Sequence, residues 1–326
     1  MKDLHLVRGH VYDQEPMKKG YGRGLVEAGK RYDNVVAASS DVTGSTGTDA
    51  FAEAFPERFI QVGVAEQNLV TVASGLAAVG KLPFAAAYGS FNPGRNWEQI
   101  RTTICINNQP VKIIATHVGL SDSGDGSTHQ MLEDIALMRA LPNMTVIAPC
   151  DSIEAAKATL ALADYPHPAY MRIARDDTHI ITTEKTPFEI GEAYIFRPGV
   201  DLTIAATGRM TYHALEAAKL LAKDGIEAEV LHVPTIKPLN MEVVLDSAAR
   251  TGCVLSVEEA QISGGLGGAI AELLGEQLPM PLRRLGMRDH FGESGQPEEL
   301  FEHFGLNAKH IAAAAHNLLT PARRGR

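Results

Sequence analysis

Short runs of β-branched and apolar residues alternate with helical patterns along most of this chain. In the first half the β-rich runs are "NVVAASSDV", "RFIQVGV", "LPFAAAYGSF", "VKIIATH" and "MTVIAPC", and helical stretches separate them. Such alternation is typical of a doubly wound parallel sheet, because parallel strands must be joined by crossovers that are usually helices. The pattern therefore predicts an α/β fold.

The alternation lapses once, which indicates two domains. Residues 176–190 read "DDTHIITTEKTPFEI", a polar, proline-containing stretch, and a second alternating unit follows with "DLTIAAT", "IEAEVLHV", "GCVLSVEE" and "LRRLGM". A chain of 326 residues has the length of two ordinary domains. We expect a first domain at residues 1–180, a linker at 181–190 and a smaller doubly wound domain at 191–326.

Charge and cysteine content exclude several classes of protein. The formal net charge is −9, which argues against nonspecific binding to nucleic acid. Cys105, Cys150 and Cys253 are far apart and show neither a metal spacing nor a disulfide framework, so we expect three reduced, buried thiols. The sequence shows no signal peptide and no apolar run of membrane-spanning length, so we expect a soluble, cytoplasmic protein.

A glycine cluster resembles a dinucleotide-binding motif but lacks its spacing. Gly264–Gly268 reads "GGLGG" after a predicted strand and at the start of a predicted helix. The G-x-G-x-x-G pattern of a dinucleotide site is absent. We therefore expect these glycines to allow close packing between strand and helix.

A single carboxylate stands out in "FIQVGVAEQNL", residues 59–69. The segment begins as a strand, and Glu66 then precedes the apolar helical run "VTVASGLAAVG". A carboxylate in apolar surroundings is costly to bury without a partner. A favourable interaction with the helix dipole would explain the position of Glu66 but not these surroundings. We therefore interpret Glu66 as a functional residue.

A second set of chemically active side chains lies in "ATHVGLSDSGDGSTHQ", residues 115–130. His117 follows a predicted strand, and Asp125 and His129 lie on the Gly/Ser-rich loop after it. Ligands bind at the carboxyl ends of strands in open parallel sheets. Two imidazoles and a carboxylate there can orient hydroxyl groups and move protons. Each residue alone could be an ordinary surface or turn residue, but together with Glu66 they indicate a site.

These motifs resemble the C-terminal portion of transketolase, in the form of the enzyme that is divided into two chains. The resemblance covers nearly the whole sequence and runs in family order. It rests on "SSDVTGST", "RFIQVGVAEQNLV", "YGSFNPGRNWEQIR", "THVGLSDSGDGSTHQ", "TVIAPCDSIEA", "RIARDD" and "VEEAQISGGLGGAIAE". It implies a pyrimidine-binding domain of thiamine-diphosphate enzymes followed by a transketolase C-terminal domain.

The resemblance assigns cofactor-binding roles to part of the chain. It implies that Glu66 hydrogen-bonds a ring nitrogen of the cofactor's aminopyrimidine and thereby activates the cofactor. Tyr88 and Phe91 match an aromatic wall against that ring, although core packing is the simpler interpretation of either residue alone. Asp41 matches an aspartate near the thiazolium end. The implied reaction moves a two-carbon ketol unit from a ketose phosphate to an aldose phosphate.

The resemblance also assigns substrate-binding roles. It implies that His129 holds the ketol hydroxyl and that Asp125 reads hydroxyl stereochemistry next to the bond that is cut. His117, Ser45 and Arg175 match the residues that grip the terminal phosphate of the sugar, with Arg175 as a bidentate anchor. His117 and His129 are, with Glu66, the expected catalytic residues.

Three positions depart from the family pattern. Lys18 replaces an arginine that belongs to the phosphate-binding set. A lysine ammonium acts as a point charge, whereas an arginine guanidinium can donate two parallel hydrogen bonds to one acidic group. Because of this change, the acidic group of the substrate could also be a sulfonate or a phosphate at a different position. Gly94 replaces an aromatic residue of large single-chain transketolases, and Ala260 replaces a common histidine.

The metal-binding half of such a site is missing from the sequence. Gly124–Gly126 reads "GDG", but the stretch "APCDSIEAAKATLALA" that follows lacks the asparagine that would complete the ligand set for Mg²⁺. We therefore expect no metal site on this chain. The implied partner is a separate N-terminal subunit with the GDG…N motif that binds Mg²⁺ and diphosphate, in an α₂β₂ heterotetramer. Pentose-phosphate intermediates are the default substrates.

Three alternative functions remain open at this point. The beta subunit of a 2-oxo-acid dehydrogenase shares the glutamate and the domain order but does not need the phosphate-binding set. A transketolase for branched or sulfonated sugars would account for Lys18. A scaffold that has lost the chemistry would not need Glu66, Asp125 and His129. A single-chain deoxyxylulose-phosphate synthase fits less well, because it would carry its own diphosphate domain.

Overall fold

The larger domain is built on a seven-stranded sheet. The structure is a computed structural model, and it describes residues 4–7, 9 and 11–323. The strands are β2 (Val35–Ser39), β3 (Phe59–Gln61), β4 (Leu82–Tyr88), β5 (Lys112–Thr116), β6 (Thr145–Ile147), β7 (Ala169–Ile173) and β12 (Thr235–Lys237). Their order is β12-β6-β7-β5-β4-β2-β3, and all are parallel except β12. The predicted α/β fold is confirmed.

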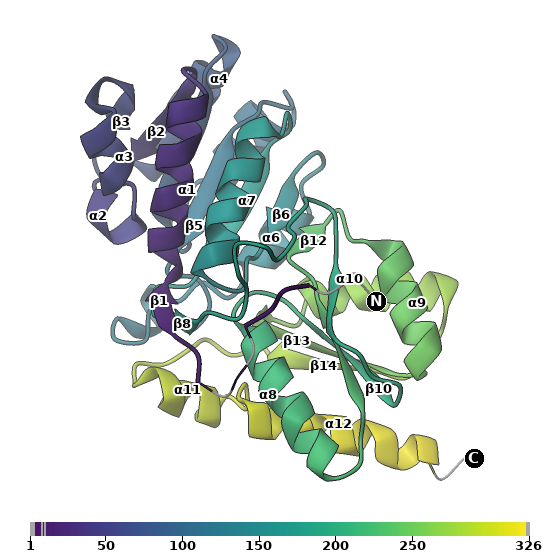
Figure 1. The fold of residues 1–326 in the computed structure, drawn as a ribbon. Coiled ribbons are helices and arrows are strands. Elements are labelled where there is room, and N and C mark those ends of the chain that lie inside the picture. Colours follow the sequence, from purple (N-terminus) through teal and green to yellow (C-terminus); the bar gives the residue numbers. More distant parts are fainter. Residues whose placement is uncertain (1–3, 8, 10, 324–326) are drawn as a thin grey trace.

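Helices on both faces of this sheet, and short helical turns in its loops, connect the strands (Figure 1). They are α1 (Met17–Arg31), α2 (Thr43–Thr46), α3 (Asp49–Ala54), η1 (Pro56–Arg58), α4 (Glu66–Ala78), α5 (Trp97–Gln99), η2 (Ile100–Cys105), η3 (Gly126–Thr128), α6 (Asp134–Arg139) and α7 (Ser152–Asp164). Figure 1 shows α1 and α7 side by side on the near face. The strands β2, β5 and β7 are fully buried and mainly apolar, as expected for a parallel sheet with both faces covered.

Glycines in α1 explain how closely these two helices approach. A Cβ atom on Gly20 would lie 1.8 Å from the backbone oxygen of Ser152, and one on Gly24 would lie 2.6 Å from that of Ala156. Any larger residue would push the helices apart. Asp151 is the N-cap residue of α7, because its side chain accepts a hydrogen bond from the backbone N–H of Glu154.

The smaller domain has a five-stranded sheet with the order β14-β13-β10-β11-β9, in which only β9 is antiparallel. Its strands are β9 (Tyr194–Arg197), β10 (Leu202–Ala206), β11 (Ala228–His232), β13 (Val254–Gln261) and β14 (Leu282–Met287). Its helices are α8 (Met210–Lys223), α9 (Met241–Thr251), α10 (Leu266–Gln277), α11 (Pro297–His303) and α12 (Ala308–Arg323). Figure 1 shows α8 beside α12 below the sheet.

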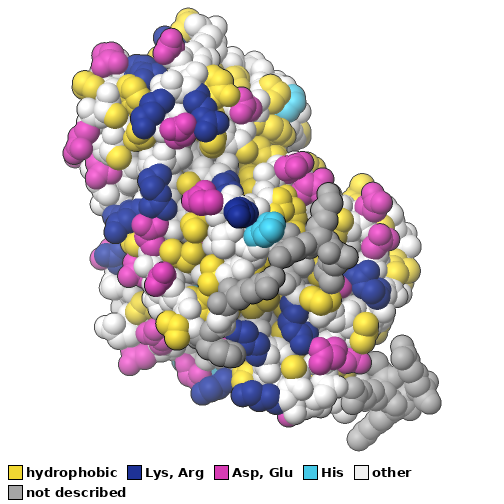
Figure 2. Space-filling model, in the orientation of Figure 1, with side chains coloured by type: hydrophobic (Ala, Val, Ile, Leu, Met, Phe, Trp, Pro, Cys, Tyr) yellow, Lys and Arg dark blue, Asp and Glu magenta, His cyan; other side chains and the backbone are white. Residues whose placement is uncertain are grey.

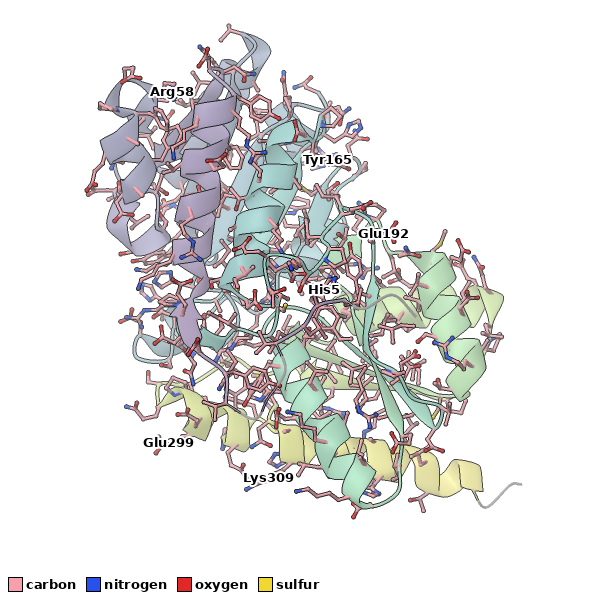
Figure 3. The ribbon with its side chains drawn as sticks, viewed as in Figure 1. His5, Arg58, Tyr165, Glu192, Glu299 and Lys309 are labelled. Atoms are coloured by element: carbon pink, nitrogen blue, oxygen red, sulfur yellow. The ribbon has the colours of Figure 1, made fainter. Side chains whose placement is uncertain are left out.

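The two domains share structural elements. Strand β12 lies between β11 and α9 in sequence, yet it pairs with β6 at the edge of the first sheet. The region predicted to contain the linker also carries β8 (Asp177–His179), which pairs with β1 (Gln14–Pro16). Figure 3 shows His5 at the junction, where its carbonyl accepts hydrogen bonds from Thr183 and Thr186. The predicted domain limits therefore remain a prediction, because chain segments cross between the domains.

The glycine cluster at residues 264–268 has the predicted packing role. The carboxylate of Glu258 accepts hydrogen bonds from the N–H groups of Leu266 (2.7 Å) and Gly267 (2.8 Å) at the start of α10. A Cβ on Gly265 would lie 1.9 Å from Glu258 Oε2. The protein's own carboxylate thus occupies the position where a bound phosphate would lie.

The cysteine prediction is also confirmed, since Cys105, Cys150 and Cys253 are buried and free of disulfides. Among the described residues, no helix has the length and apolar character that crossing a membrane would require.

Candidate active site

The predicted site residues follow the carboxyl ends of the parallel strands in the first sheet. Successive loops carry them, so the topology directs residues that are far apart in sequence to one edge of the sheet. They are Asp41 and Ser45 after β2, Glu66 after β3, Tyr88 and Phe91 at the end of β4, His117, Asp125 and His129 after β5, and Arg175 after β7. Lys18 lies in the first turn of α1, next to the loop after β2.

Glu66 is the first residue of α4 and is only 5% exposed. Within the described part of the chain, no hydrogen-bond donor reaches its carboxylate. The nearest cationic group is Arg95, whose Nε lies 3.9 Å from Glu66 Oε2 on a side chain that is 65% exposed. The carboxylate therefore keeps free acceptor positions in a largely desolvated place, which suits a donor from a ligand.

Two buried asparagines that the sequence reasoning missed hold the start of α4. The Nδ2 group of Asn96 donates to the backbone oxygen of Glu66 (2.9 Å) and to Oδ1 of Asn92 (3.1 Å). Asn92 in turn donates to the backbone oxygens of Ala85 and Ile114 in β4 and β5. This chain of hydrogen bonds fixes Glu66 relative to the sheet. The N-x-x-x-N spacing of these two asparagines does not by itself reveal such a contact.

Aromatic and imidazole rings form a cluster between β4 and β5. Tyr88 stacks on His117 with ring centroids 3.8 Å apart, and Phe91 lies 6.1 Å from Tyr88 at an interplanar angle of 24°. His129 meets the edge of Phe91 at 5.6 Å. The structure therefore brings together four of the predicted residues. Tyr88 and Phe91 thus present roughly parallel rings, which suits stacking with a flat ligand ring.

Gly94 is explained by the tight loop in this region. A Cβ on Gly94 would lie 2.2 Å from the backbone oxygen of Ser90. An aromatic residue at this position would therefore require a different path of the loop after β4.

His117 is held as a neutral imidazole. It is 4% exposed, has a positive φ of 61° and shares a hydrogen bond of 2.8 Å between its Nδ1 and the hydroxyl of Thr116. Burial and the positive charges of Arg175 and Lys18 lower the pKa of His117 to about 3. A neutral imidazole between two cations can donate or accept a hydrogen bond but adds no charge of its own.

Arg175 is held by a carboxylate that the sequence reasoning did not identify. Its Nη1 lies 3.0 Å from Oδ1 of Asp122, which is fully buried, and its backbone N–H donates to the hydroxyl of Ser121. Burial raises the pKa of Asp122, although the charge of Arg175 opposes this. Because the Arg175 side chain is 44% exposed, part of its guanidinium remains open to an acidic ligand.

Asp125 and His129 lie on the loop of residues 118–131, which we call the 118–131 loop. Asp125 is exposed and precedes the single turn η3, and its charge acts on the pKa values of both His117 and Asp122. His129 is anchored through its backbone oxygen, which accepts a hydrogen bond of 2.6 Å from the hydroxyl of Ser90. The loop thus presents a carboxylate and an imidazole to the same place.

Lys18 and the loop after β2 complete this edge. Lys18 Nζ donates to the backbone oxygen of Gly44 at 3.3 Å, directly before half-buried Ser45. It borders a groove of about 710 Å³ that Lys19, Arg23 and Lys30 also line. Figure 2 shows lysine and arginine side chains on the surface formed by α1. The local charge therefore favours an acidic group.

Asp41 has a positive φ of 67°, and its N–H donates to Oε1 of Gln61 at 2.7 Å. Gln61 also donates to the hydroxyl of Thr43 and accepts from the N–H of Gly63. This amide therefore ties the loop of Asp41 to the segment that leads into Glu66. Sequence reasoning missed Gln61 because a glutamine at the end of a strand has no distinctive spacing.

One cluster of residue types that can bind metals occurs among the described residues. It consists of Cys150, Glu154 and His232, and these residues are hydrogen-bonded to one another. Glu154 accepts hydrogen bonds from His232 Nε2 (2.9 Å) and from the N–H of Cys150 (2.7 Å), and the other ring nitrogen of His232 is bonded to Thr211. Because Glu154 belongs to α7 and His232 to β11, the cluster joins the two domains.

Comparison with protein families matches both halves of the chain. Residues 14–179 match the model described as "Transketolase, pyrimidine binding domain", and residues 191–311 match "Transketolase, C-terminal domain". The first match covers all the predicted site residues.

Individual relatives agree with these matches over nearly the full chain. A "Putative transketolase C-terminal section" of Methanocaldococcus jannaschii is 46% identical over 91% of this chain and 94% of its own length. The "6-deoxy-6-sulfo-D-fructose transketolase subunit SqwH" of a Clostridium species is 42% identical over 90% of this chain and 91% of its own. A solved structure, "Split gene transketolase, inactive beta4 tetramer", has a TM-score of 0.88 and 43% identity, covering 94% of this chain and 98% of that one.

Proposed function

The chain belongs to the transketolase family and corresponds to the C-terminal subunits of its split members, and we propose that it forms one half of a thiamine-diphosphate-dependent transketolase. In this proposal the complex moves a two-carbon ketol unit from a ketose phosphate to an aldose phosphate. The observation that carries the proposal is Glu66, a nearly buried carboxylate with free acceptor positions, whose backbone is tied through Asn96 and Asn92 to the loop that carries Phe91.

The residues of this site suit the aminopyrimidine end of thiamine diphosphate. Glu66 would share a proton with a ring nitrogen through a hydrogen bond, and Phe91 with Tyr88 would hold the flat ring. Asp41 would lie toward the other end of the cofactor. When bound, thiamine diphosphate supplies the nucleophilic carbon and the electron sink for cutting the bond next to a ketone.

The contribution of Glu66 to catalysis is to hold a proton at a fixed place. Its position is set by Asn96 and the first turn of α4, so its carboxyl group can share a proton with the lone pair of a ring nitrogen without reorganising. The exposed Arg95 side chain is free to move away when that nitrogen arrives.

The substrate end of the site is built to orient hydroxyls and an acidic group. We assign His129 to the ketol hydroxyl and Asp125 to the neighbouring hydroxyl, because both side chains extend from the same loop beside His117. Arg175, Lys18 and Ser45 would bind the terminal acidic group, and neutral His117 would donate a hydrogen bond to it.

Either a phosphate or a sulfonate fits this binding set. A relative that is 42% identical carries a sulfonated sugar in its name. Lys18 would attract either group as a point charge, and Arg175 would donate two parallel hydrogen bonds to either group. We propose sugar phosphates as the first substrates to test, with sulfonated sugars as the competing class.

Catalysis by this proposal needs a second subunit. Within the described residues, Asp125 of the GDG sequence faces His117 and Asp122, and the one metal-type cluster is buried and internally bonded. We propose that the diphosphate and Mg²⁺ are bound by a partner chain carrying a GDG…N motif, in an α₂β₂ assembly. A relative solved as an inactive tetramer of its β chains supports the view that this half does not act alone.

The test is to purify the tagged chain from its source cells under conditions that preserve complexes and to identify bound proteins by mass spectrometry. The proposal predicts a partner with the GDG…N motif and ketol transfer between sugar phosphates by the reconstituted pair. Acyltransferase components in the complex, with turnover of pyruvate, would support a 2-oxo-acid dehydrogenase instead. Recovery of the chain alone would contradict the need for a partner.

A further inference from the structure

The 118–131 loop, which carries Asp125 and His129, is held at both ends by the smaller domain. Val118 and Met131 form a bridge, and the N–H of Gly119 donates to the backbone oxygen of Met131 at 2.6 Å, so the two ends of the loop adjoin. Leu120 and Leu132 are each 1% exposed and belong to the hydrophobic cluster of the smaller domain, with residues of β10, α8 and α12. The loop thus leaves the first sheet, and the leucines at its two ends are buried in the hydrophobic core of the smaller domain.

A buried carboxylate of the smaller domain fixes the first end of this loop. Glu259 in β13 is 2% exposed, and its Oε1 accepts a hydrogen bond of 2.7 Å from the N–H of Leu120. Gly119 has a positive φ of 67°, and a Cβ there would lie 2.4 Å from the carboxyl carbon of Glu259. Arg172 donates to the backbone oxygen of Glu259. Only a glycine allows this close contact.

A second segment of the smaller domain fixes the other end. Residues 288–296 connect β14 to α11, and Figure 3 labels Glu299 in α11 just beyond this connection. Gln130 is 4% exposed, and its Nε2 donates to the backbone oxygens of Glu293 (3.0 Å) and Leu120 (3.4 Å). A Cβ on Gly292 would lie 1.8 Å from Gln130 Oε1.

The middle of the loop is also contacted. The N–H of Gly295 donates to the backbone oxygen of Ser123 at 3.0 Å. A Cβ on Gly126 would lie 2.3 Å from the hydroxyl oxygen of Ser294. These contacts lie on either side of Asp125 in the sequence, so residues 288–296 hold the backbone next to this exposed side chain.

We propose that the smaller domain determines substrate stereospecificity by clamping the 118–131 loop, with Gln130 as the positioning residue. This inference rests on the proposed function, because it assumes that Asp125 and His129 read the hydroxyls of a sugar. The segment "GLSDSGDG" is rich in glycine and serine and has high conformational entropy when free. Discrimination between hydroxyl epimers requires hydrogen-bonding groups at fixed positions, and the clamp supplies that constraint from outside the site.

The test uses two variants and a matched control. Gly292→Ala acts from the smaller domain, because its new Cβ must displace the Gln130 amide. Gln130→Met keeps the size of the side chain and removes the donor. Gly275→Ala in α10 is the control, since a Cβ there has nothing within 4 Å. Each variant is studied in the complex with the partner subunit.

Two measurements are made on each complex. Hydrogen–deuterium exchange follows the amides of residues 121–129, and kcat/KM is compared for two pentulose 5-phosphates that differ only in configuration at carbon 3. We expect both variants to speed exchange roughly tenfold. We also expect the preference between the two donors to fall by about threefold to tenfold, with a smaller effect on kcat for the better donor. The control should match the wild type.

Unchanged exchange in both variants would overturn the clamp, and faster exchange with an unchanged donor ratio would overturn its role in specificity. A wild-type complex that transfers no ketol unit from either donor would instead refute the proposed function, and exchange would still decide whether the smaller domain holds the loop.

Discussion

The buried, hydrogen-bonded pair of Glu154 and His232 between the two domains should be far more important for stability than an exposed histidine–carboxylate pair. His232 Nε2 lies 2.9 Å from Glu154 Oε2, with side chains 0% and 2% exposed. His316 Nε2 lies 3.0 Å from Asp224 Oδ2, with side chains 44% and 59% exposed. The two pairs have nearly the same geometry and differ in burial. His232→Leu and His316→Leu therefore form a matched comparison.

Removing the imidazole of His232 leaves the Glu154 carboxylate buried, with the N–H of Cys150 as its remaining donor. Breaking one side of a buried pair costs about 3–5 kcal/mol, whereas an exposed pair contributes about 0–1 kcal/mol. At about 2–4 °C per kcal/mol, His232→Leu should lower Tm by on the order of 10 °C, and His316→Leu by only a few degrees.

The effect should also depend on pH. Burial alone would raise the pKa of Glu154, but the charge and hydrogen bond of His232 outweigh it and leave that pKa below the ordinary 4.5. The pair therefore contributes its stability at neutral pH, and this contribution is lost as pH falls through the lowered pKa. Unfolding in urea and by heat at pH 7 and at acidic pH measures both effects. Equal destabilisation by the two substitutions at pH 7 would refute the reasoning.

Two further predictions concern the candidate site. Asp125→Ala should mainly weaken discrimination between epimeric donors, by roughly tenfold in relative kcat/KM, because it removes a hydrogen-bonding partner of one hydroxyl; unchanged relative rates across epimers would exclude this role. His117 should stay neutral from pH 5 to 8, since burial, Arg175 and Lys18 lower its pKa to about 3. Its unfolded form binds a proton near pH 6.5, so His117 should reduce stability as pH falls from about 6.5 toward 3. An NMR titration of its imidazole near pH 6.5 would contradict this.

Much of the fold follows from local sequence patterns. The strands β2, β4 and β5 and the helix α4 correspond to the apolar runs named from the sequence, because their burial pattern is encoded within each segment. Strand β12 could not be found in this way. Its three residues pair with β6, a segment far away in sequence, so its strand character comes from a tertiary contact.

In the candidate site, too, some residues can be recognised from the local sequence and others only from tertiary contacts. Glu66 and Asp125 have sequence signals, because a carboxylate in an apolar run or beside glycines is unusual. The residues that hold the site have none. Asn96, Gln61 and Gln130 act through backbone groups of other segments, and an amide side chain has no periodicity or spacing that reveals such a contact. Only the arrangement of the loops in space identifies them.

The measurement that tests the account most directly is ketol transfer by the reconstituted complex carrying Glu66→Gln. The substitution keeps the size of the side chain but removes the group that holds the proton of the cofactor ring. We expect turnover to fall by roughly 10²–10⁴-fold, with assembly of the two subunits unchanged in size-exclusion chromatography. Normal turnover by a correctly assembled Glu66→Gln complex would contradict the assignment of Glu66 and, with it, the proposed mechanism.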